Sequence, residues 1–476
     1  MTKRSAWKTG CILFLVYAAT EISLPAQTFT TVHAFDGTDG EEPFAGLVQA
    51  TNGDLYGTTS AGGVTLAGTV FKISSNGTLT TLHNFNGGDN TDGAYPYAAL
   101  VQATNGNFYG TTTYGGTMFL GAVFEMTESG TLTVLDSLDQ MEGEYPYAGL
   151  VQATNGDLYG TTTYSFGTVF KITPSGTLTP LHAFCSETCV NGEFPYAGLV
   201  VANDGNLYGT NIQGGACGGD CGGGTVFKIT PSGTLTTLYS FCLQSGCPDG
   251  DAPYGSLVQS TSGDLYGTTL AGGSNNEGTV FKITTSGTLI TLHNFDGTDG
   301  ADPYAGLVQA TDGNLYGTTF YGGANNAGTV FKITPNGTLT TLHSFDGTDG
   351  ANPTAGLVQA TNGDLYGTTC ACIVLANGRN NGASYDYGTV FRLSVGLGPF
   401  VKMLPAAGNA GAEVGILGTA LTGATSVTFN GTPAQFSVPL PSLILTHVPT
   451  GATTGKIEVT LPGQTLSSDV PFYVLR

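Results

Sequence analysis

Seven short loops in this 476-residue chain carry oxygen-bearing side chains in one order: an acidic or amide residue, glycine, two further residues, then proline. Three of them share the segment Asp-Gly-Thr-Asp-Gly, in which a second aspartate stands three positions earlier. Carboxylate and carbonyl oxygens suit calcium, although the spacing of an EF-hand loop and its closing glutamate are absent. The same residues also suit a tight turn, because aspartate and asparagine accept local backbone hydrogen bonds. Both interpretations stay open, and the candidate calcium ligands are Asp36, Asp39, Asp296, Asp299, Asp346 and Asp349.

An aromatic residue directly follows the proline in six of these seven loops. Packing between repeats explains aromatic residues at a fixed period, and a collar that binds a sugar or a peptide is the alternative. Further aromatic residues in exposed loops make the collar more plausible. The predicted ligand-binding residues are Tyr97, Tyr147, Tyr196, Tyr254, Tyr304, Tyr114, Phe320, Tyr321 and Tyr385.

Eight of the nine cysteines fall in four local pairs, and local disulfides are the expectation for such pairs in an exported chain. A zinc site is the alternative, but thiolate sites usually draw their ligands from two clusters. The last pair is separated by one residue, which makes its bridge the least certain. The pairs are Cys185/Cys189, Cys217/Cys221, Cys242/Cys247 and Cys370/Cys372.

Other residues that could carry catalysis show no arrangement of their own. Five histidines recur at one position of the repeat, about one repeat apart, which is too far to share a metal, so we interpret them as packing residues. Lysines recur at another position and are expected to form a solvated stripe. No nucleophile elbow or phosphate-binding loop occurs. Loop carboxylates are plentiful, so glycoside hydrolysis by a carboxylate pair remains an alternative.

The elements that must position these residues follow a repeat of about 50 residues, marked seven times by Leu-Tyr-Gly-Thr or a near copy. Each repeat predicts four short strands, here named a to d, rich in β-branched and aromatic residues and bounded by glycine, asparagine, aspartate or proline. In the first repeat they are residues 45–49, 55–59, 68–73 and 78–85.

One copy of strand d precedes the first repeat, and the last repeat has no strand d of its own. Residues 28–35 match it, whereas the last repeat stops after its strand c at Leu393. The first strand can therefore complete the last sheet, which removes both exposed sheet edges. The sequence predicts an all-β, seven-bladed β-propeller over residues 28–394, closed by its N-terminal strand. An open solenoid is the alternative, but it leaves the first strand unexplained.

The loops differ between the two ends of such blades. Turns a–b and c–d share one end and are uniform, whereas loops b–c and d–a share the other end and vary in length and sequence. We name the second end the variable face. Variable loops on a rigid scaffold usually carry recognition, so this face is the predicted binding face.

Composition changes after the repeats. Residues 395–398 read as a linker, and residues 399–476 contain about seven short strand-like runs, as expected of a small β-sandwich. At the other end, residues 1–26 have a basic start and a short apolar run, which predicts a signal peptide, with a retained anchor as the alternative. The chain is therefore expected to be secreted or at the cell surface.

The formal charge of −21 disfavours nucleic acid as a partner. It suits divalent cations or basic partners, so calcium is the one cofactor that the sequence leaves possible. We expect a monomer without membrane insertion.

Two segments resemble known families. Gly53–Thr59 and Gly68–Ile73, with their copies over residues 28–394, resemble the GloVer repeats of secreted bacterial "choice-of-anchor" proteins. Residues 399–476 resemble the IPT/TIG family, which implies an immunoglobulin-like β-sandwich, through Gly411–Gly418, Thr425–Gly431, Val448-Pro449 and Gly455–Val459. The first resemblance implies export and an extracellular role, and the second implies a spacer or interaction module. Neither implies a catalytic residue.

These observations favour a non-enzymatic protein that binds an extracellular glycan or protein through its variable face. The alternative is a polysaccharide-active hydrolase or lyase that uses loop carboxylates on the same face.

Overall fold

The computed structural model describes residues 27–74, 76–87, 91–185, 188–216, 222–370 and 387–475. These residues form strands, turns and loops without a helix, so the prediction of an all-β chain is confirmed. Accordingly, nothing in these ranges has the helical length and apolar character that crossing a bilayer requires. The predicted signal peptide, residues 1–26, lies outside the described residues.

The first repeat folds into a four-stranded antiparallel sheet of β2 (Val48–Gln49), β3 (Leu55–Thr59), β4 (Thr69–Ile73) and β5 (Leu79–Asn84), in that order. Strands β3 and β4 are almost wholly buried, whereas β5 is half-buried at the outer edge. The repeated four-stranded sheet expected from the sequence is thus confirmed, although strand a is shorter than predicted.

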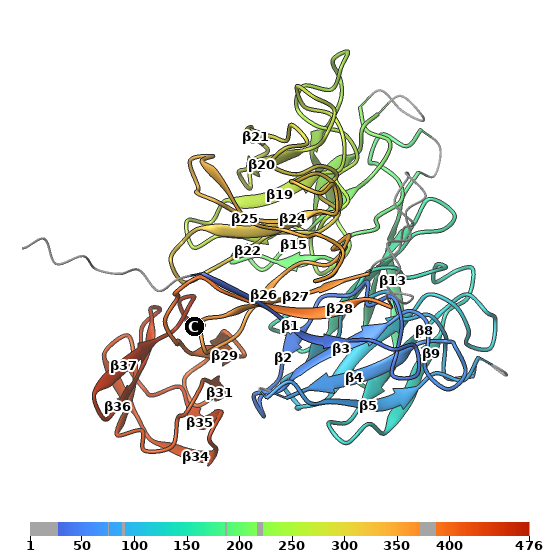
Figure 1. Ribbon diagram of the computed structural model, residues 1–476. Helices are drawn as coiled ribbons and strands as arrows, with labels where there is room; N and C mark the ends of the chain where they lie inside the picture. The colour runs from blue at the N-terminus through green and yellow to red at the C-terminus, as the bar shows by residue number, and fades with distance from the viewer. Residues whose placement is uncertain are drawn as a thin grey trace, which may run out of the picture.

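Five further repeats have the same strand order and pairing (Figure 1). Their strands are β6 (Val101–Gln102), β7 (Phe108–Thr112), β8 (Ala122–Met126) and β9 (Leu132–Ser137); β10 (Val151–Gln152), β11 (Leu158–Thr162), β12 (Thr168–Ile172) and β13 (Leu178–Ala183); β14 (Val200–Val201), β15 (Leu207–Asn211), β16 (Thr225–Ile229) and β17 (Leu235–Ser240); β18 (Val258–Gln259), β19 (Leu265–Thr269), β20 (Thr279–Ile283) and β21 (Leu289–Asn294); and β22 (Val308–Gln309), β23 (Leu315–Thr319), β24 (Thr329–Ile333) and β25 (Leu339–Ser344).

The last repeat borrows its outer strand from the start of the chain. Strands β26 (Val358–Gln359), β27 (Leu365–Thr369) and β28 (Thr389–Ser394) are completed by β1 (Thr28–Ala34), which pairs antiparallel with β28. Figure 1 shows the blue β1 beside the orange β28. Phe29 of β1 stacks on Phe391 with ring centroids 5.3 Å apart, so the borrowed strand also contributes to the core.

The Leu-Tyr-Gly-Thr segment explains how neighbouring sheets pack. Tyr56 is fully buried and stacks on Phe108 of the next repeat, with centroids 4.2 Å apart. A Cβ atom at Gly57 would lie 2.6 Å from the Phe71 ring, so this glycine leaves the space that the phenylalanine fills. The Thr58 hydroxyl donates a hydrogen bond to the carbonyl of Ala98 at 2.9 Å. Each residue of the motif therefore serves packing within or between sheets.

Loops b–c and d–a lie together, as the sequence predicted. Isolated β-bridges join Glu41 to Ala61 and Ala94 to Tyr114, each pairing a d–a loop with a b–c loop. The same bridge recurs in three later repeats. The variable face is therefore one continuous end of the array of sheets.

Residues after the repeats form two four-stranded sheets around one core. The first contains β29 (Lys402–Leu404), β31 (Glu413–Leu417), β35 (Leu443–His447) and β34 (Phe436–Leu440). The second contains β33 (Thr432–Ala434), β32 (Ser426–Phe429), β36 (Ile457–Leu461) and β37 (Gln464–Ser467). A parallel pair, β30 (Ala407–Gly408) and β38 (Tyr473–Val474), flanks them. We call this part the C-terminal module.

The C-terminal module packs against the a–b turns, at the end opposite the variable face (Figure 1). The Ser442 hydroxyl donates to the carbonyl of Thr51 at 2.8 Å, and the hydroxyls of Thr361 and Thr419 lie 2.9 Å apart. A cavity of about 950 Å³ separates the module from the turns of repeats two to five. The module therefore leaves the variable face uncovered.

Candidate binding site

A cavity of about 550 Å³ lies where the strand a segments of all seven repeats meet. Because those segments contain no acidic or basic residue, none of the described residues that line the cavity is charged. The lining segments are Phe44–Leu47, Tyr97–Leu100, Tyr147–Leu150, Tyr196–Leu199, Tyr254–Leu257, Tyr304–Leu307 and Thr354–Leu357.

Small residues let these segments approach one another closely. A Cβ atom at Gly149 would lie 2.7 Å from the carbonyl oxygen of Ala99, and one at Gly306 only 2.3 Å from that of Ser256. Glycine is therefore required at these positions by backbone contact between neighbouring repeats. The close approach brings the aromatic residue at the start of each segment to a common mouth.

Aromatic rings form a collar at the variable-face end of the cavity. Each half-buried ring contacts the next, and centroid distances between consecutive rings range from 4.8 to 5.4 Å. Thr354 takes the seventh position, where its hydroxyl lies 3.4 Å from the carbonyl oxygen of Phe44 and leaves a gap in the aromatic wall. The aromatic collar consists of Phe44, Tyr97, Tyr147, Tyr196, Tyr254 and Tyr304.

The phenol groups of the collar stay protonated well above neutral pH. Burial raises the pKa of Tyr97, Tyr196 and Tyr304. Burial, followed by the interaction with Tyr114, raises the pKa of Tyr147 strongly. Burial is also the main cause of the strongly raised pKa of Tyr254. The collar thus offers neutral hydroxyl groups and aromatic surface, and its phenols are poor general bases.

The structure brings the five predicted collar tyrosines together around one cavity, and ligand binding by them stays a prediction. Tyr114 is 39% exposed and Tyr321 is half-buried beside the mouth. Phe320, predicted to be exposed, is only 7% exposed because it packs between Tyr304 and Tyr321, with centroids 5.0 and 4.7 Å away. Tyr385 lies outside the described residues.

Aspartates of the d–a loops form hydrogen-bonded turns. Asp36 Oδ1 accepts hydrogen bonds from the amide and hydroxyl of Thr38, at 2.9 and 2.6 Å. These bonds lower the pKa of Asp36. Asp39 Oδ1 accepts the amide of Asp36 at 3.0 Å, and its Oδ2 lies 2.7 Å from His33 Nε2. The same turn is built by Asp296 with Asp299 and by Asp346 with Asp349. Calcium binding here stays a prediction.

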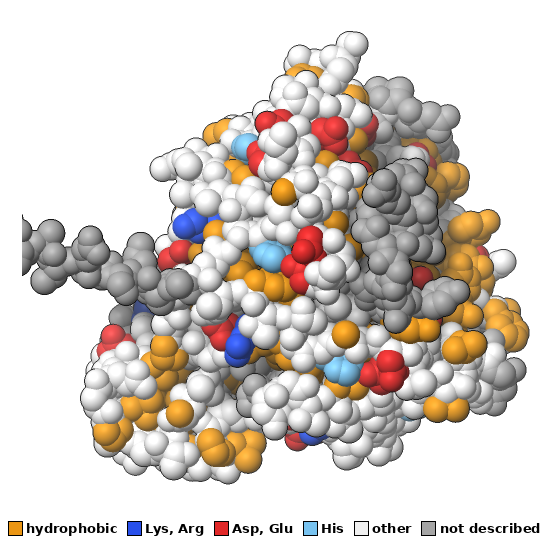
Figure 2. All heavy atoms as spheres, in the orientation of Figure 1, with side chains coloured by type: hydrophobic (Ala, Val, Ile, Leu, Met, Phe, Trp, Pro, Cys, Tyr) orange, Lys and Arg blue, Asp and Glu red, His pale blue; other side chains and the backbone are white. Residues whose placement is uncertain are grey.

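The histidines do more than pack, which corrects the interpretation made from the sequence. Each contacts a nearby phenylalanine ring, but four also bond a loop aspartate within 2.7–2.9 Å. In Figure 2 pale blue histidines lie directly beside red acidic side chains. The histidine–aspartate pairs are His33–Asp39, His83–Asp92, His293–Asp299 and His343–Asp349.

The lysine stripe is also paired rather than merely solvated. Lys228 lies 2.9 Å from Asp204 of the preceding a–b turn, and Lys282 lies 3.3 Å from Asp264. Related ion pairs occur at Lys72 and Lys171. These pairs lie on the a–b side of the sheets, away from the collar.

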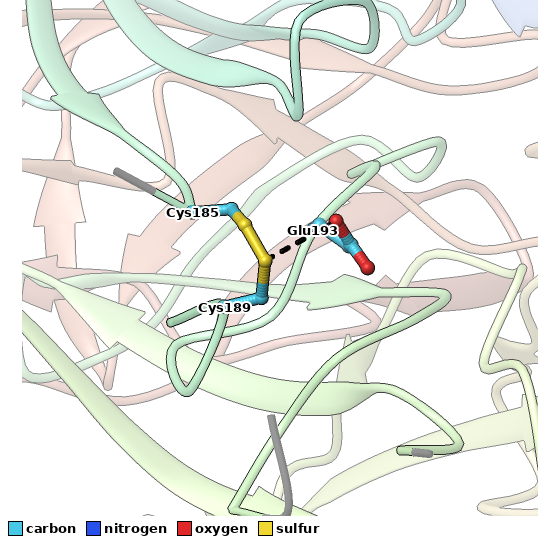
Figure 3. Close-up of side chains that lie close together, drawn as sticks. All are labelled: Cys185, Cys189 and Glu193. Atoms are coloured by element: carbon cyan, nitrogen blue, oxygen red, sulfur yellow. Dashed lines mark hydrogen bonds between the residues drawn. A yellow bond between two sulfur atoms is a disulfide. The ribbon is translucent and has the colours of Figure 1, made fainter. Parts of the chain in front are cut away.

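Two of the four predicted disulfides, Cys185–Cys189 and Cys242–Cys247, are present in the described residues. Figure 3 shows the first, with Cys189 Sγ 3.5 Å from a carboxylate oxygen of the buried Glu193. Because both sulfurs of each pair are bonded to one another, neither pair offers the thiolates that zinc needs.

The two other cysteine pairs are only partly described. Cys370 is disulfide-bonded, and its predicted partner Cys372 lies outside the described residues. Cys217 and Cys221 lie outside them as well.

The fold is similar to solved structures of enzymes, at identities that show shared fold alone. A streptogramin B lyase matches with a TM-score of 0.53 and 15% identity, over 77% of this chain and 97% of the other. A virginiamycin B lyase from Staphylococcus aureus matches with a TM-score of 0.52 and 13% identity, over 78% of this chain and 99% of the other. A fungal alcohol oxidase of the AA5 family in complex with copper matches with a TM-score of 0.51 and 12% identity, over 94% of this chain and 99% of the other. No curated protein matches the sequence.

A model of the Gloeobacter/Verrucomicrobia repeat matches residues 18–218 and 165–378, two overlapping ranges that contain most of the repeats described above. The matched region covers more than half of the 476 residues. The chain therefore belongs to the Gloeobacter/Verrucomicrobia repeat family.

Proposed function

We propose that this protein is a secreted or cell-surface binding protein whose variable face receives an extracellular glycan or protein. The observation that carries the proposal is the aromatic collar around a cavity without charged lining residues. Concave sites with aromatic walls and a few polar groups are typical of ligand binding. The disulfides support an oxidising, extracellular setting.

We infer that the seven sheets are the blades of a closed propeller. Bonds between the last and first repeats support this: Thr368 donates to Ala45, and the amide of Thr361 donates to Gln49. The two packed sheets of the C-terminal module support an immunoglobulin-like spacer of the IPT/TIG type. In this arrangement the spacer holds the propeller from the side opposite the mouth.

A second candidate function is polysaccharide hydrolysis or elimination by loop carboxylates. It is favoured by Asp302, whose pKa is raised by burial and by the nearby charge of Glu277, as a general acid requires. Glu42 stands at the equivalent position of the first repeat. No contact among the described residues brings these two carboxylates together, so we place the binding function first.

The test is to present purified protein to arrays of extracellular glycans and of exported proteins, and to assay any bound glycan for released product. We expect saturable binding without product, weakened by Tyr196→Ala in the collar. Binding that is unaffected by this variant would contradict the proposed site. Turnover that is lost in Asp302→Asn would instead establish the enzyme.

A further inference from the structure

The residue before each loop proline adopts an unusual backbone conformation. In all seven repeats its φ angle lies between 50° and 60°, a left-handed region that residues other than glycine rarely adopt. The chain has 74 glycines, yet none of these seven residues is glycine. We name them the pre-proline ring: Glu42, Tyr95, Tyr145, Phe194, Ala252, Asp302 and Asn352.

The backbone of this ring joins neighbouring repeats. The amide of Tyr95 donates to the carbonyl of Ala67 in the first repeat at 2.9 Å, and its own carbonyl accepts from the amide of Thr113 in the second at 3.2 Å. The amide of Glu42 makes the equivalent bond to Tyr387 of the last repeat, at 3.0 Å. These bonds use main-chain atoms only, and a glycine at the same position would form them with less strain.

Side chains are therefore held at a position where the backbone bonds do not need them, although the buried Asn352 uses its side chain to donate a hydrogen bond to the carbonyl of Phe320 at 3.0 Å. Strain of this kind persists where the surrounding structure imposes it, and it gathers at functional sites. While the backbone is nearly identical in all seven repeats, the side chains range from alanine and aspartate to tyrosine. These residues combine a fixed geometry with a changing chemistry, as expected of positions that determine specificity.

Three adjacent members of the ring extend the aromatic wall of the cavity. Tyr95 and Tyr145 contact Tyr114, with ring centroids 5.8 and 5.0 Å away, and Tyr114 lies near enough to Tyr147 of the collar to raise the pKa of that phenol. Tyr164 contacts Tyr145 at 5.4 Å and is 57% exposed.

The third member, Phe194, contacts Phe166 with centroids 6.1 Å apart. Figure 2 shows hydrophobic side chains gathered at the right-hand edge of the molecule, beside β8 in Figure 1. An aromatic surface thus runs outward from the cavity over repeats two to four. We name it the aromatic sector: Tyr95, Tyr114, Tyr145, Tyr164, Phe166 and Phe194.

Charge and size restrict what this surface accepts. The cavity has no charged lining residue, and the formal charge of −21 disfavours acidic ligands. A cavity of about 550 Å³ suits a small ligand or the end of a chain rather than a protein surface. Aromatic faces beside neutral hydroxyl groups match the apolar faces and hydroxyls of a sugar. A neutral carbohydrate meets all of these conditions.

We propose that the variable face binds a neutral carbohydrate chain, with its end in the collar cavity and the following sugar on the aromatic sector. The three aromatic members of the pre-proline ring, Tyr95, Tyr145 and Phe194, then determine which chain is accepted. This inference rests on the proposed binding function and names its ligand class.

The first experiment uses the full chain on one array that holds neutral glycans (α- and β-glucans, xylans, mannans and chitin fragments), acidic glycans (polygalacturonate and alginate) and exported proteins. We expect binding to neutral glycans only. Binding to proteins or acidic glycans alone would overturn this inference and leave the binding function intact. An absence of any binding would count against both.

The second experiment separates recognition from folding through the unusual backbone. Tyr95→Gly relieves the backbone strain and removes the aromatic side chain. We therefore expect an unchanged or higher melting temperature, together with at least about fivefold weaker binding to the neutral glycan that the array identifies. Tyr95→Phe should keep the affinity. Ala420→Gly is the matched control: it relieves the same left-handed strain, at a φ of 56°, in the C-terminal module and should leave binding unchanged.

If Tyr95→Gly binds as tightly as the natural chain while Tyr196→Ala does not, the pre-proline ring has no role in specificity. If Tyr95→Gly lowers the melting temperature as well as the affinity, the side chain is structural and the assignment fails.

Discussion

The hydroxyl of Thr368 donates a hydrogen bond to the carbonyl of Ala45 at 3.1 Å, although 323 positions separate the two residues. The same bond joins Thr58 to Ala98 in consecutive repeats. The last and first repeats therefore meet through an interface like the internal ones, and β1 lies at the outer edge of that interface.

The first prediction tests the borrowed strand. The ring of Phe29 stacks on His343 with centroids 3.8 Å apart and contacts Phe345 and Phe391. We expect Phe29→Ala to lower the free energy of unfolding by about 2–4 kcal/mol, because a half-buried ring is lost. Chemical denaturation measures the change. Phe29→Leu, the residue of most equivalent positions, is the control and should lose less than about 1.5 kcal/mol. An unaffected alanine variant would show that β1 does not stabilise the array.

The second prediction concerns His182, whose d–a loop has Asn191 at the position where the loops of the four paired histidines have aspartate. His182 Nε2 is buried without a hydrogen-bond partner among the described residues, and burial lowers the pKa of His182 below 6.5. The unfolded chain then binds more protons than the folded one, so stability through this group falls as pH drops below 6.5.

Asn191→Asp should supply the missing partner at this histidine. We expect a rise of about 1 kcal/mol in the free energy of unfolding and a reversal of this pH dependence, because the carboxylate raises the histidine pKa. Melting temperatures across mildly acidic and neutral pH measure both. Asn191→Ala is the control, and an equal gain there would contradict the explanation.

The third prediction concerns the repeat in which both partners are acidic. Burial raises the pKa of Asp136, and burial together with the charge of Asp136 raises the pKa of Glu142. Raised carboxyl pKa values mean that the folded chain holds protons the unfolded chain releases, so this pair destabilises the fold as pH rises.

Asp136→His introduces the residue that most other repeats have at this position. We expect it to increase the free energy of unfolding at neutral pH by up to about 1 kcal/mol. Asp136→Asn removes only the repulsion with Glu142 and should increase the free energy of unfolding by a smaller amount. Equal effects of the two variants on thermal unfolding would argue against an ion pair.

The fourth prediction tests the glycine of the repeated motif. A Cβ atom at Gly160 would lie 2.6 Å from the Phe170 ring and 2.7 Å from Leu150. Gly160→Ala should therefore destabilise the chain by about 1–3 kcal/mol through overpacking. Adding Phe170→Leu makes room and should restore part of the loss, as a double-mutant cycle would show. No coupling between the two changes would place the cause elsewhere.

The fifth prediction separates a turn from a calcium site in the d–a loops. Asp36 already accepts bonds from Thr38 and Asp39, so we expect added calcium or a chelator to leave the melting temperature unchanged. Asp36→Ala should lower the melting temperature because the turn is lost. We expect the free energy of unfolding to fall by about 1 kcal/mol. A rise with calcium that chelation reverses would establish the metal site instead.

Local pattern was sufficient to predict the elements of the fold. Strand b was placed at residues 55–59, as observed, because its β-branched and aromatic residues and its flanking turn residues both occur within a few positions. The displaced strand at residues 28–35 likewise predicted the pairing of β1 with β28. The collar could be predicted because its residues follow a proline at a fixed spacing.

Features that depend on three-dimensional contact were missed. His83 and Asp92 are nine residues apart, whereas His33 and Asp39 are six apart, so unequal loop lengths hid a shared pair. The exposure expected for Phe320 failed because Tyr304 and Tyr321 of the same repeat pack against its ring. The left-handed backbone at Tyr95 also gave no signal, since a residue before proline is usually extended. Bonds to two adjacent repeats impose it, and these exist only after folding.

Because the interfaces between repeats are built from the same few bonds, a repeat exchanged for another would meet equivalent partners on both sides. Thr111 donates to Ala148 and Thr318 to Ala355, at 3.0 and 3.1 Å, as Thr368 does to Ala45. Recombination within the gene can thus reorder the loops of the variable face while the scaffold keeps its stability. The molecule is built so that its surface can diversify by shuffling whole units as well as by point mutation.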